Sequence, residues 1–327
     1  TSGDLINVGD TRISFLTDDT SVGALAGHRM GGYRIVERIG RGGMGIVYKA
    51  EQVDLQREVA LKVLSEENGT DKEFINLFVH EARASAKLNH PHIVQVYDVK
   101  RHGTVYYFSM EYVSGGSLQD LLNQDRKIEP DRAIQMILDA SRGLEYAHSK
   151  GFVHRDIKPD NLMISEEGQI KIADLGLARR VDEKVGPSEE HVVFGTPHYI
   201  APEQVLGRPA DFRSDIYSLG STAYRMLAGT TPYQAPGIRD LVSKKVKEDP
   251  KLLHEVAPDI PRELSDLVHR MMARDPQQRF ETTAEVCTDL EKIQKQLFGE
   301  GEVSSSSSGP VPGLVGNRFL LISTLSL

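Results

Sequence analysis

The chain has 327 residues, a formal net charge of −8 and a single cysteine, Cys287. The length is enough for a domain of two lobes with a full core, and the acidic balance excludes sequence-independent binding to nucleic acid. One cysteine excludes an intrachain disulfide, which is typical of a reducing compartment such as the cytosol, and the chain has no signal-peptide pattern.

The first predicted elements follow a polar stretch, residues 1–26, which we expect to be a flexible leader. Strands are predicted at residues 33–36 and 47–50. Residues 40–47, which connect the two strands and include the first residue of the second, read G-x-G-x-x-G-x-V. Because strands stand on both sides, the pattern predicts a hairpin rather than the strand-to-helix turn of dinucleotide-binding folds. Glycines in such a turn let backbone amides approach phosphate groups without a Cβ clash.

An apolar strand at residues 59–63 carries Lys62 in its middle. A buried lysine is costly unless its ammonium is paired. Helical spacing of apolar residues predicts a helix from Lys72 to Leu88, with Asp71 as its N-cap, and this helix carries Glu81. We therefore expect a Lys62–Glu81 ion pair. The alternative is that Glu81 is one more solvated helix carboxylate.

A longer helix is predicted at residues 130–150, because Pro130 suits its first turn and Gly151 suits its end. It leads into residues 154–161, His-Arg-Asp-Ile-Lys-Pro-Asp-Asn, and Asp-Leu-Gly follows at residues 174–176. Phosphoryl transfer needs a carboxylate to orient the attacking hydroxyl, a lysine to offset charge, and Asn and Asp to hold Mg²⁺. The spacing of these residue types is that of a protein-kinase catalytic loop.

With these motifs, and with RGGMGIVYKA, HPHIVQVYDV and ARDPQQRF, residues 27–297 resemble the eukaryotic-like (Hanks-type) serine/threonine protein kinases, especially bacterial receptor-like members. The resemblance implies an α+β, bilobal fold with ATP bound between the lobes. The small, β-rich N-lobe with one main helix would span residues 27–110, the hinge 111–116, and the larger, mostly helical C-lobe 117–297.

The resemblance also implies a role for each matching residue. Asp156 would be the base and Lys158 would lie near the γ-phosphate, while Glu81 would hold Lys62 against the α- and β-phosphates. Asn161 and Asp174 would bind Mg²⁺, with Mn²⁺ as an alternative. Met110 would be the gatekeeper, and Glu111 and Val113 would offer backbone groups to adenine. The full set expected to bind the nucleotide is Ile39, Gly40, Gly42, Gly45, Val47, Ala60, Lys62, Met110, Glu111 and Val113.

Two further interactions are expected to be structural. Glu203 would pair with Arg279 in a buried bridge, and Asp215 would anchor the catalytic-loop backbone from the start of a buried helix. Leu175 stands where the family most often has Phe, which is an accepted variation. Cys287 lies on a predicted late helix, residues 282–297, and is expected to be a packing residue.

The activation segment carries the regulatory candidates. Arg155 precedes the predicted base, and in this family such an arginine marks activation segments that are ordered by a phosphate. Ser188 is followed by two glutamates, and our hypothesis is that Glu190 supplies fixed negative charge, so that activity depends only partly on phosphorylation of Ser188. The alternative is a solvated acidic loop. The hydroxyl of Thr196 would form hydrogen bonds to Asp156 and Lys158. This expected contact, and the position of Lys158 two residues after the base, both favour specificity for Ser/Thr over Tyr.

Beyond the kinase-like region, residues 298–317 are rich in Gly, Ser and Pro and are predicted to be a linker. Residues 318–327 are apolar but far shorter than the ~20 residues that a spanning helix needs. Our hypothesis is that they begin a truncated transmembrane segment, which would anchor a cytoplasmic kinase domain to the inner membrane. A frayed tail is the alternative.

The sequence thus predicts an ATP-dependent serine/threonine protein kinase that acts on proteins in signal transduction, itself included, with homodimers as a route to autophosphorylation. One rival is a pseudokinase scaffold, which the presence of Lys62, Glu81, Asp156, Asn161 and Asp174 disfavours. Another rival is a small-molecule kinase of similar fold. The Gly-Thr-Pro and Ala-Pro-Glu motifs at residues 195–197 and 201–203, which build a platform for a peptide, argue against that rival.

Overall fold

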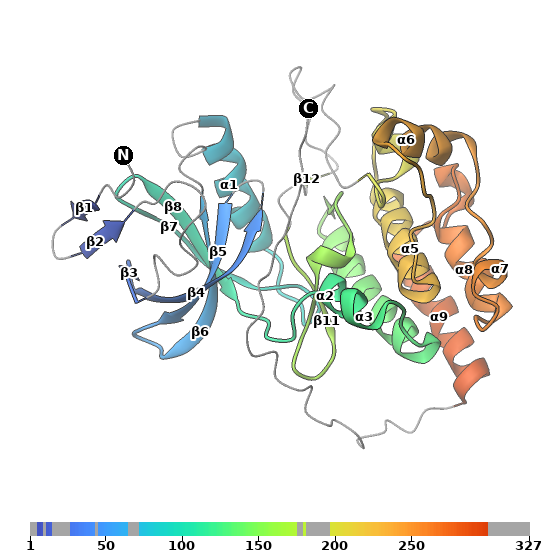
Figure 1. Ribbon diagram of the computed structural model, residues 1–327, viewed down its shortest axis with the longest axis horizontal. Helices are drawn as coiled ribbons and strands as arrows, with labels where there is room; N and C mark the ends of the chain where they lie inside the picture. The colour runs from blue at the N-terminus through green and yellow to red at the C-terminus, as the bar shows by residue number, and fades with distance from the viewer. Residues whose placement is uncertain are drawn as a thin grey trace. The chain divides into compact units, whose positions relative to one another are not determined.

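A computed structural model describes residues 5–8, 11–14, 27–42, 45–64, 72–174, 179–180 and 197–299. The chain divides into two compact units (Figure 1). Of the described residues, the first unit contains those up to Asn89 together with Val94–Val113, and the second contains His90–Ile93 and those from Ser114 onward. The predicted α+β class is confirmed, with the sheet in the first unit and most helices in the second.

The first unit is built on a six-stranded antiparallel sheet in the order β3-β4-β5-β6-β8-β7. The strands are β3 (Arg29–Met30), β4 (Tyr33–Gly42), β5 (Gly45–Gln52), β6 (Arg57–Leu64), β7 (Val96–His102) and β8 (Val105–Glu111). Each predicted strand lies within one of these. One face of the sheet buries a cluster of nine residues: Met30, Tyr33, Ile35, Tyr48, Ala50, Val59, Leu61, Val63 and Tyr107.

Helix α1 (Lys72–Ser85) lies beside the sheet in Figure 1 and contacts β7. It buries Phe78 and Ala82 with Leu64, Val96 and Phe108, and the rings of Phe78 and Phe108 are 5.0 Å apart. The helix ends three residues before the predicted Leu88, because the amide of Leu88 bonds the carbonyl of Ser85 and closes a tighter turn. The predicted N-cap, Asp71, is outside the described residues.

The second unit contains eight described α-helices and four short strands. The helices are α2 (Leu118–Asp125), α3 (Pro130–Ser149), α4 (Pro202–Val205), α5 (Phe212–Ala228), α6 (Ile238–Lys247), α7 (Leu253–Val256), α8 (Arg262–Met271) and α9 (Thr283–Phe298). The strands are β9 (Phe152–Val153), β10 (Leu162–Ile164), β11 (Ile170–Ile172) and β12 (Arg179–Arg180), and two 3-10 turns are η1 (Pro159–Asn161) and η2 (Pro276–Gln278). Helix α3 contacts α5 and α9, as the ribbon in Figure 1 shows. An extensive hydrophobic core lies among the helices of this unit.

Local sequence signals account for the ends of α3 and α9. Pro130 occupies the first turn of α3, as predicted, and Gly151 adopts φ +80° just after its end. Thr282 caps α9 by accepting a hydrogen bond from the amide of Glu285, and Cys287 is buried on that helix. Burial raises the pKa of the Cys287 thiol to about 11, which agrees with its predicted packing role.

Two segments differ from the sequence-based picture. Within the expected leader, β1 (Leu5–Val8) and β2 (Thr11–Ser14) pair antiparallel. Residues 90–93, which we expected in the N-lobe, pack with the second unit, because His92 Nδ1 lies 2.9 Å from the carbonyl of Ile170 and Ile93 bridges Ile172. Within the described ranges, no helix combines the length and apolarity needed to cross a bilayer. The predicted linker after residue 299 and the apolar tail lie outside those ranges.

Candidate active site

Lys62 and Glu81 form a buried ion pair inside the first unit. Lys62 Nζ lies 2.6 Å from Glu81 Oε1, and the two residues are only 7% and 2% exposed. Strand β6 supplies the lysine, and α1 directs Glu81 inward because Phe78 and Ala82, on the same helix face, pack in the core. The Lys62 ammonium also stands 5.6 Å from the centroid of the Phe108 ring. Because both charges are removed from water, loss of either one would leave the other buried without a partner.

Replacing Lys62 by Met is expected to lower the free energy of unfolding by about 3 kcal/mol, because the Glu81 carboxylate stays buried without its cation. Urea denaturation followed by circular dichroism measures the loss. Lys100→Met is the matched control, since Lys100 pairs with Asp98 at 2.7 Å in the same sheet but both side chains are largely exposed. The control should change stability by less than about 1 kcal/mol. Equal losses in the two variants would contradict this account of the pair.

The predicted nucleotide-binding glycines and apolar residues lie on four adjacent strands. In the register, Gly40 faces Val47, Gly42 faces Gly45, and Val47 faces Lys62. A Cβ on Gly45 would lie 2.1 Å from the Val63 carbonyl oxygen, so close packing of β5 on β6 by itself demands glycine there. The tip of this hairpin, residues 43–44, is outside the described residues.

The remaining nucleotide-binding candidates lie on β6 and β8 and just beyond. Ala60 is buried and faces Met110 in the register, and Met110 packs against the core cluster under α1. The amide of Glu111 donates to the carbonyl of Gln95 at 2.8 Å, so this amide is already bonded within the first unit. Val113 is buried.

In the second unit, the catalytic-loop backbone is held by Asp215, which is fully buried at the start of α5. Its carboxylate accepts hydrogen bonds from the amides of His154 and Arg155, both at 2.8 Å, and lies 2.9 Å from His148 Nε2. Arg155 has φ 70°, in the left-handed region that costs energy for a residue with a side chain. Asp215 therefore stabilises a strained backbone next to Asp156, as the sequence predicted for an anchor.

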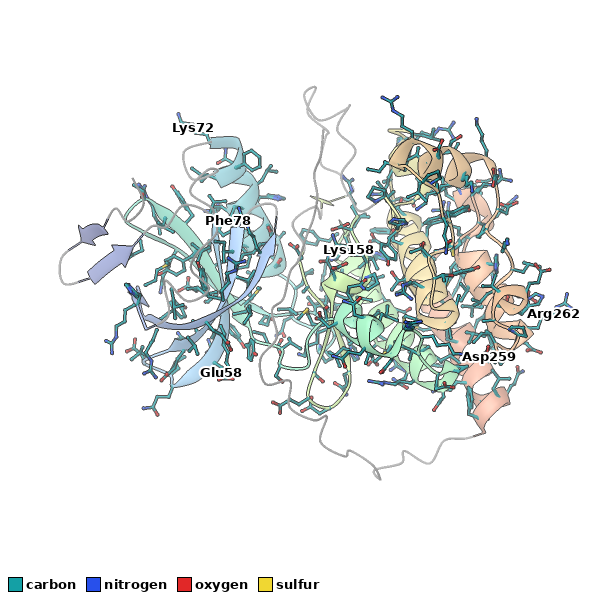
Figure 2. The ribbon with its side chains drawn as sticks, viewed as in Figure 1. Glu58, Lys72, Phe78, Lys158, Asp259 and Arg262 are labelled. Atoms are coloured by element: carbon teal, nitrogen blue, oxygen red, sulfur yellow. The ribbon has the colours of Figure 1, made fainter. Side chains whose placement is uncertain are left out.

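The side chains of the loop converge on Asp156. Lys158, labelled in Figure 2, places Nζ 2.8 Å from Asp156 Oδ2. Asn161 Nδ2 donates to the Asp156 carbonyl at 2.8 Å and to its Oδ2 at 3.1 Å. Since the amide nitrogen of Asn161 points to Asp156, the oxygen Oδ1 is the atom of this amide that a metal ion would take.

The hairpin β10–β11 brings Asp174 back to Asn161. The amide of Ala173 donates to the Asn161 carbonyl at 2.8 Å, and His154 Nε2 lies 3.1 Å from the Ala173 carbonyl. Asp174 has φ 61°, a second strained residue with a side chain at this site. The described residues contain no cluster of three or more His, Cys, Asp or Glu side chains suited to a metal ion. One amide and one carboxylate oxygen nevertheless fit Mg²⁺, which takes few protein ligands when phosphates and water supply the rest.

A second buried ion pair joins Glu203, on α4, to Arg279, which directly follows η2. Arg279 donates to both carboxylate oxygens of Glu203 at 2.7 Å, and Ser214 Oγ also donates to Glu203 at 2.7 Å. The sequence predicted the Glu203–Arg279 pair. It did not predict Lys245, which is buried with no side-chain exposure, or Gln204, whose Nε2 donates to the Arg155 carbonyl at 3.2 Å. Lys245 follows the buried Leu241 by four residues, a spacing that places both on one helix face.

The buried carboxylates of Asp215 and Glu203 make the free energy of unfolding depend on pH. Burial opposes ionisation of Asp215 and Glu203, but hydrogen bonds from His148 and from Arg279 outweigh it, so the pKa of each lies below its ordinary value of 3.8 or 4.5. A lowered pKa stabilises the fold above the unfolded value and loses that contribution as pH falls. We expect the free energy of unfolding to decline below about pH 4.5, measured by urea denaturation from pH 3 to 7. The decline should be shallower for Glu203→Gln; an unchanged slope would contradict the assignment.

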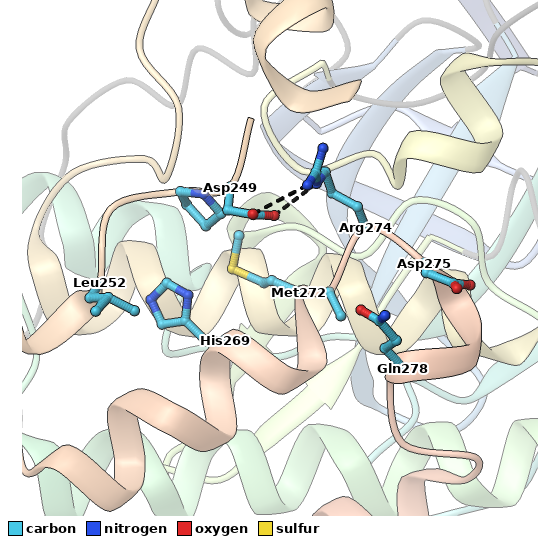
Figure 3. A pocket seen from close by; sticks show the side chains of 9 residues that line it. Asp249, Leu252, His269, Met272, Arg274, Asp275 and Gln278 are labelled. Carbon is cyan, nitrogen blue, oxygen red and sulfur yellow. Dashed lines mark hydrogen bonds and ion pairs between the residues drawn. The ribbon is translucent and has the colours of Figure 1, made fainter. Parts of the chain in front are cut away.

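Three regulatory candidates lie outside the described residues: Ser188, Glu190 and Thr196. Leu175, noted above as an accepted variation, lies outside them as well. A cavity of about 550 Å³ does occur in the second unit, lined by residues between Asp249 and Gln278, but it contains none of the predicted site residues (Figure 3). Arg274, one of the residues that line it, donates two hydrogen bonds to Asp249, at 2.8 and 3.3 Å. The predicted catalytic groups lie instead on the loop that Asp215 holds.

Comparison with known proteins matches residues 33–290 to the protein kinase domain family. The chain is 36% identical over 274 residues to a probable serine/threonine-protein kinase of Clostridium perfringens. It is 38% identical over 268 residues to serine/threonine-protein kinase PknB of Mycolicibacterium smegmatis, and 36% identical over 301 residues to PknB of Mycobacterium tuberculosis. These alignments cover 84%, 80% and 88% of the chain but 39%, 43% and 48% of the relatives. The chain thus spans less than half the length of these relatives.

Proposed function

This chain belongs to the protein kinase family, and we propose that it transfers the γ-phosphoryl group of ATP to serine and threonine hydroxyls of proteins, with Mg²⁺ as the metal and Mn²⁺ as an alternative. The observation that carries the proposal is the convergence of Lys158 and Asn161 on Asp156, with Asp174 tied back to Asn161 through the Ala173 amide. A carboxylate, a cation and two oxygen ligands on one braced loop are the groups that phosphoryl transfer needs.

In the proposed reaction, Asp156 orients the substrate hydroxyl and accepts its proton. The hydroxyl oxygen forms a bond to the γ-phosphorus while the bond from that phosphorus to the β,γ-bridging oxygen breaks, and ADP leaves. Lys158 offsets the negative charge on the group in transit. Bound at Asn161 and Asp174, Mg²⁺ would neutralise charge on the phosphates. Most of the rate enhancement would come from positioning and electrostatic stabilisation.

The first unit supplies the proposed nucleotide contacts. Lys62, held by Glu81, would bind the α- and β-phosphates, and the glycine-containing strands β4 and β5 would bring backbone amides to the phosphates. The apolar residues Val47, Ala60 and Met110 would contact adenine. Because Lys62 already has a buried anionic partner, its ammonium is fixed before nucleotide binds, which reduces the entropy lost on binding.

Serine and threonine specificity is supported by Lys158, two residues after Asp156, and by the names of the relatives. Proteins are the proposed substrates, a second copy of the chain among them, and the domain would act in the cytoplasm. Arg155 and Ser188 remain proposed regulatory residues, with Glu190 supplying fixed charge beside Ser188.

The proposal is tested by the metal dependence of ATP turnover with a protein substrate. ADP and phosphoprotein should form in equal amounts with Mg²⁺, and formation should stop when a chelator removes the metal. Asp174→Asn should raise the Mg²⁺ concentration needed for half-maximal rate. Nucleotide binding without phosphoprotein under any metal would instead favour a scaffold. ADP and free phosphate formed without phosphoprotein would favour an ATPase.

A further inference from the structure

The ammonium of Lys245 is buried on α6 and bound to backbone carbonyls of another segment. Lys245 Nζ donates to the carbonyl of His198 at 2.9 Å and to that of Ile200 at 2.8 Å. The rings of Tyr217 and Tyr233 stand 5.4 and 6.0 Å from the same nitrogen. A buried charge is costly unless hydrogen bonds replace water, and here the carbonyls of residues 198 and 200 provide that replacement.

The segment that Lys245 holds reaches the catalytic loop. Tyr199, between the two carbonyls, is buried, and burial raises its pKa to about 12, with the charge of Asp160 close enough to contribute. Three residues after Ala201, the side chain of Gln204 accepts from the Ala201 amide and donates to the Arg155 carbonyl, both at 3.2 Å. A continuous path of contacts therefore runs from Lys245 to the residue before Asp156.

Helix α6 is itself anchored independently of that segment. Arg274 donates to the carbonyl of Lys247, the last residue of α6, at 2.8 Å and forms two bonds to Asp249 (Figure 3). Tyr233 Oη donates to the carbonyl of Glu248 at 3.1 Å. The backbone that carries Lys245 is thus fixed from the other side, so the ammonium is the link through which α6 constrains residues 198–200.

We propose that Lys245 is a positioning residue that holds residues 198–200 in the shape that a protein substrate requires. The inference rests on the proposed function, because a substrate hydroxyl that reaches Asp156 must pass the segment bonded to the neighbouring Arg155. Loss of the ammonium should leave the ATP contacts of the first unit unchanged. It should weaken peptide binding about tenfold, because a factor of about ten corresponds to the free energy that one hydrogen bond to a charged group contributes.

The charge on Lys245 provides an independent readout. Burial lowers its pKa to about 7, while Glu203 acts in the opposite direction. Of the groups that face it, burial lowers the pKa of His198 and raises those of Tyr217 and Tyr233. For Glu203, burial is outweighed by hydrogen bonds from Arg279 and Ser214, which lower its pKa. Between pH 7 and 9 Lys245 is therefore the group of this cluster that titrates, and its hydrogen bonds weaken as pH rises.

The test compares Lys245→Met with Lys247→Met, a change on the same helix at an exposed lysine whose backbone carbonyl accepts from Arg274. Initial rates with a serine peptide that has blocked termini and no His, Cys or Lys give the KM values for peptide and ATP. We expect Lys245→Met to raise the peptide KM about tenfold with the ATP KM unchanged, and Lys247→Met to change neither. A peptide KM equal to that of the wild type, or a parallel rise in both KM values, would overturn the inference.

The wild type alone decides the matter if Lys245→Met does not fold. Its peptide KM should rise severalfold between pH 6.5 and 9 while its ATP KM stays level. A peptide KM that does not change over this range would overturn the inference although transfer itself proceeds. Absence of transfer by the wild type would overturn the proposed function, and this inference with it. This outcome differs from failure of the inference alone, because no KM can be measured without transfer.

Discussion

Replacement of Asp156 by Asn is expected to lower kcat for phosphoryl transfer by about 10³-fold while the affinity for ATP changes little. Asparagine has nearly the same shape, but it cannot accept the hydroxyl proton. It also presents a neutral group to Lys158, which lies 2.8 Å from the carboxylate. The nucleotide contacts proposed for the first unit do not involve this side chain. Steady-state rates with saturating ATP, together with ATP binding measured by calorimetry, give the two quantities.

The matched control is Asp259→Asn, a change of one exposed carboxylate in the same unit (Figure 2). Asp259 pairs with Lys127 at 2.6 Å on the surface and has no part in the loop, so its replacement should leave kcat within about twofold. If Asp156→Asn kept more than about a tenth of the wild-type kcat, Asp156 could not be the group that accepts the proton.

Replacing Arg279 by Met is expected to lower the free energy of unfolding by about 3–5 kcal/mol and the melting temperature by roughly 10 °C. Arg279 is buried, donates two bonds to Glu203, and also donates to the backbone carbonyls of Arg213, Ala273 and Arg274. Its loss leaves the Glu203 carboxylate buried with the hydroxyl of Ser214 but without its cation. Calorimetry and urea denaturation measure both changes.

A double-mutant cycle with Glu203→Leu separates the pair from the rest of the loss. Removing both charges should recover part of the stability, because no uncompensated carboxylate then remains. Lys127→Met, at an exposed pair, should cost less than about 1 kcal/mol. Additive effects of the two replacements would contradict the interpretation of Glu203–Arg279 as one coupled unit.

Two buried contacts beside the proposed site were predicted from the sequence, one from the cost of a buried lysine and one from the resemblance to protein kinases. Lys62 within an apolar strand required a buried anion, and Glu81 lies 2.6 Å away. The resemblance implied that Asp215 anchors the catalytic loop, and the amides of His154 and Arg155 donate to its carboxylate. Both contacts also satisfy the physical requirement that a buried charge has a partner.

Other features depend on tertiary contacts that no local pattern reveals. Lys245 stands among the lysines of a polar helix, and only the folded chain shows that its face of α6 is buried against residues 198–200. The assignment of residues 90–93 to the second unit follows from hydrogen bonds to β11, not from their position between α1 and β7. Gly45 was interpreted through phosphate binding, but a Cβ at this position would lie 2.1 Å from the Val63 carbonyl oxygen, which adds a packing requirement.

The proposal that this kinase-family chain is an active Ser/Thr kinase is tested most directly by incubating it with Mg²⁺ and γ-labelled ATP, beside the Asp156→Asn variant. Mass-spectrometric mapping then locates the label. We expect phosphate on serine or threonine in the wild type alone, and the map shows whether Ser188 is used. Equal labelling of wild type and variant, or ATP binding with no label on the chain or on an added protein substrate, would contradict it.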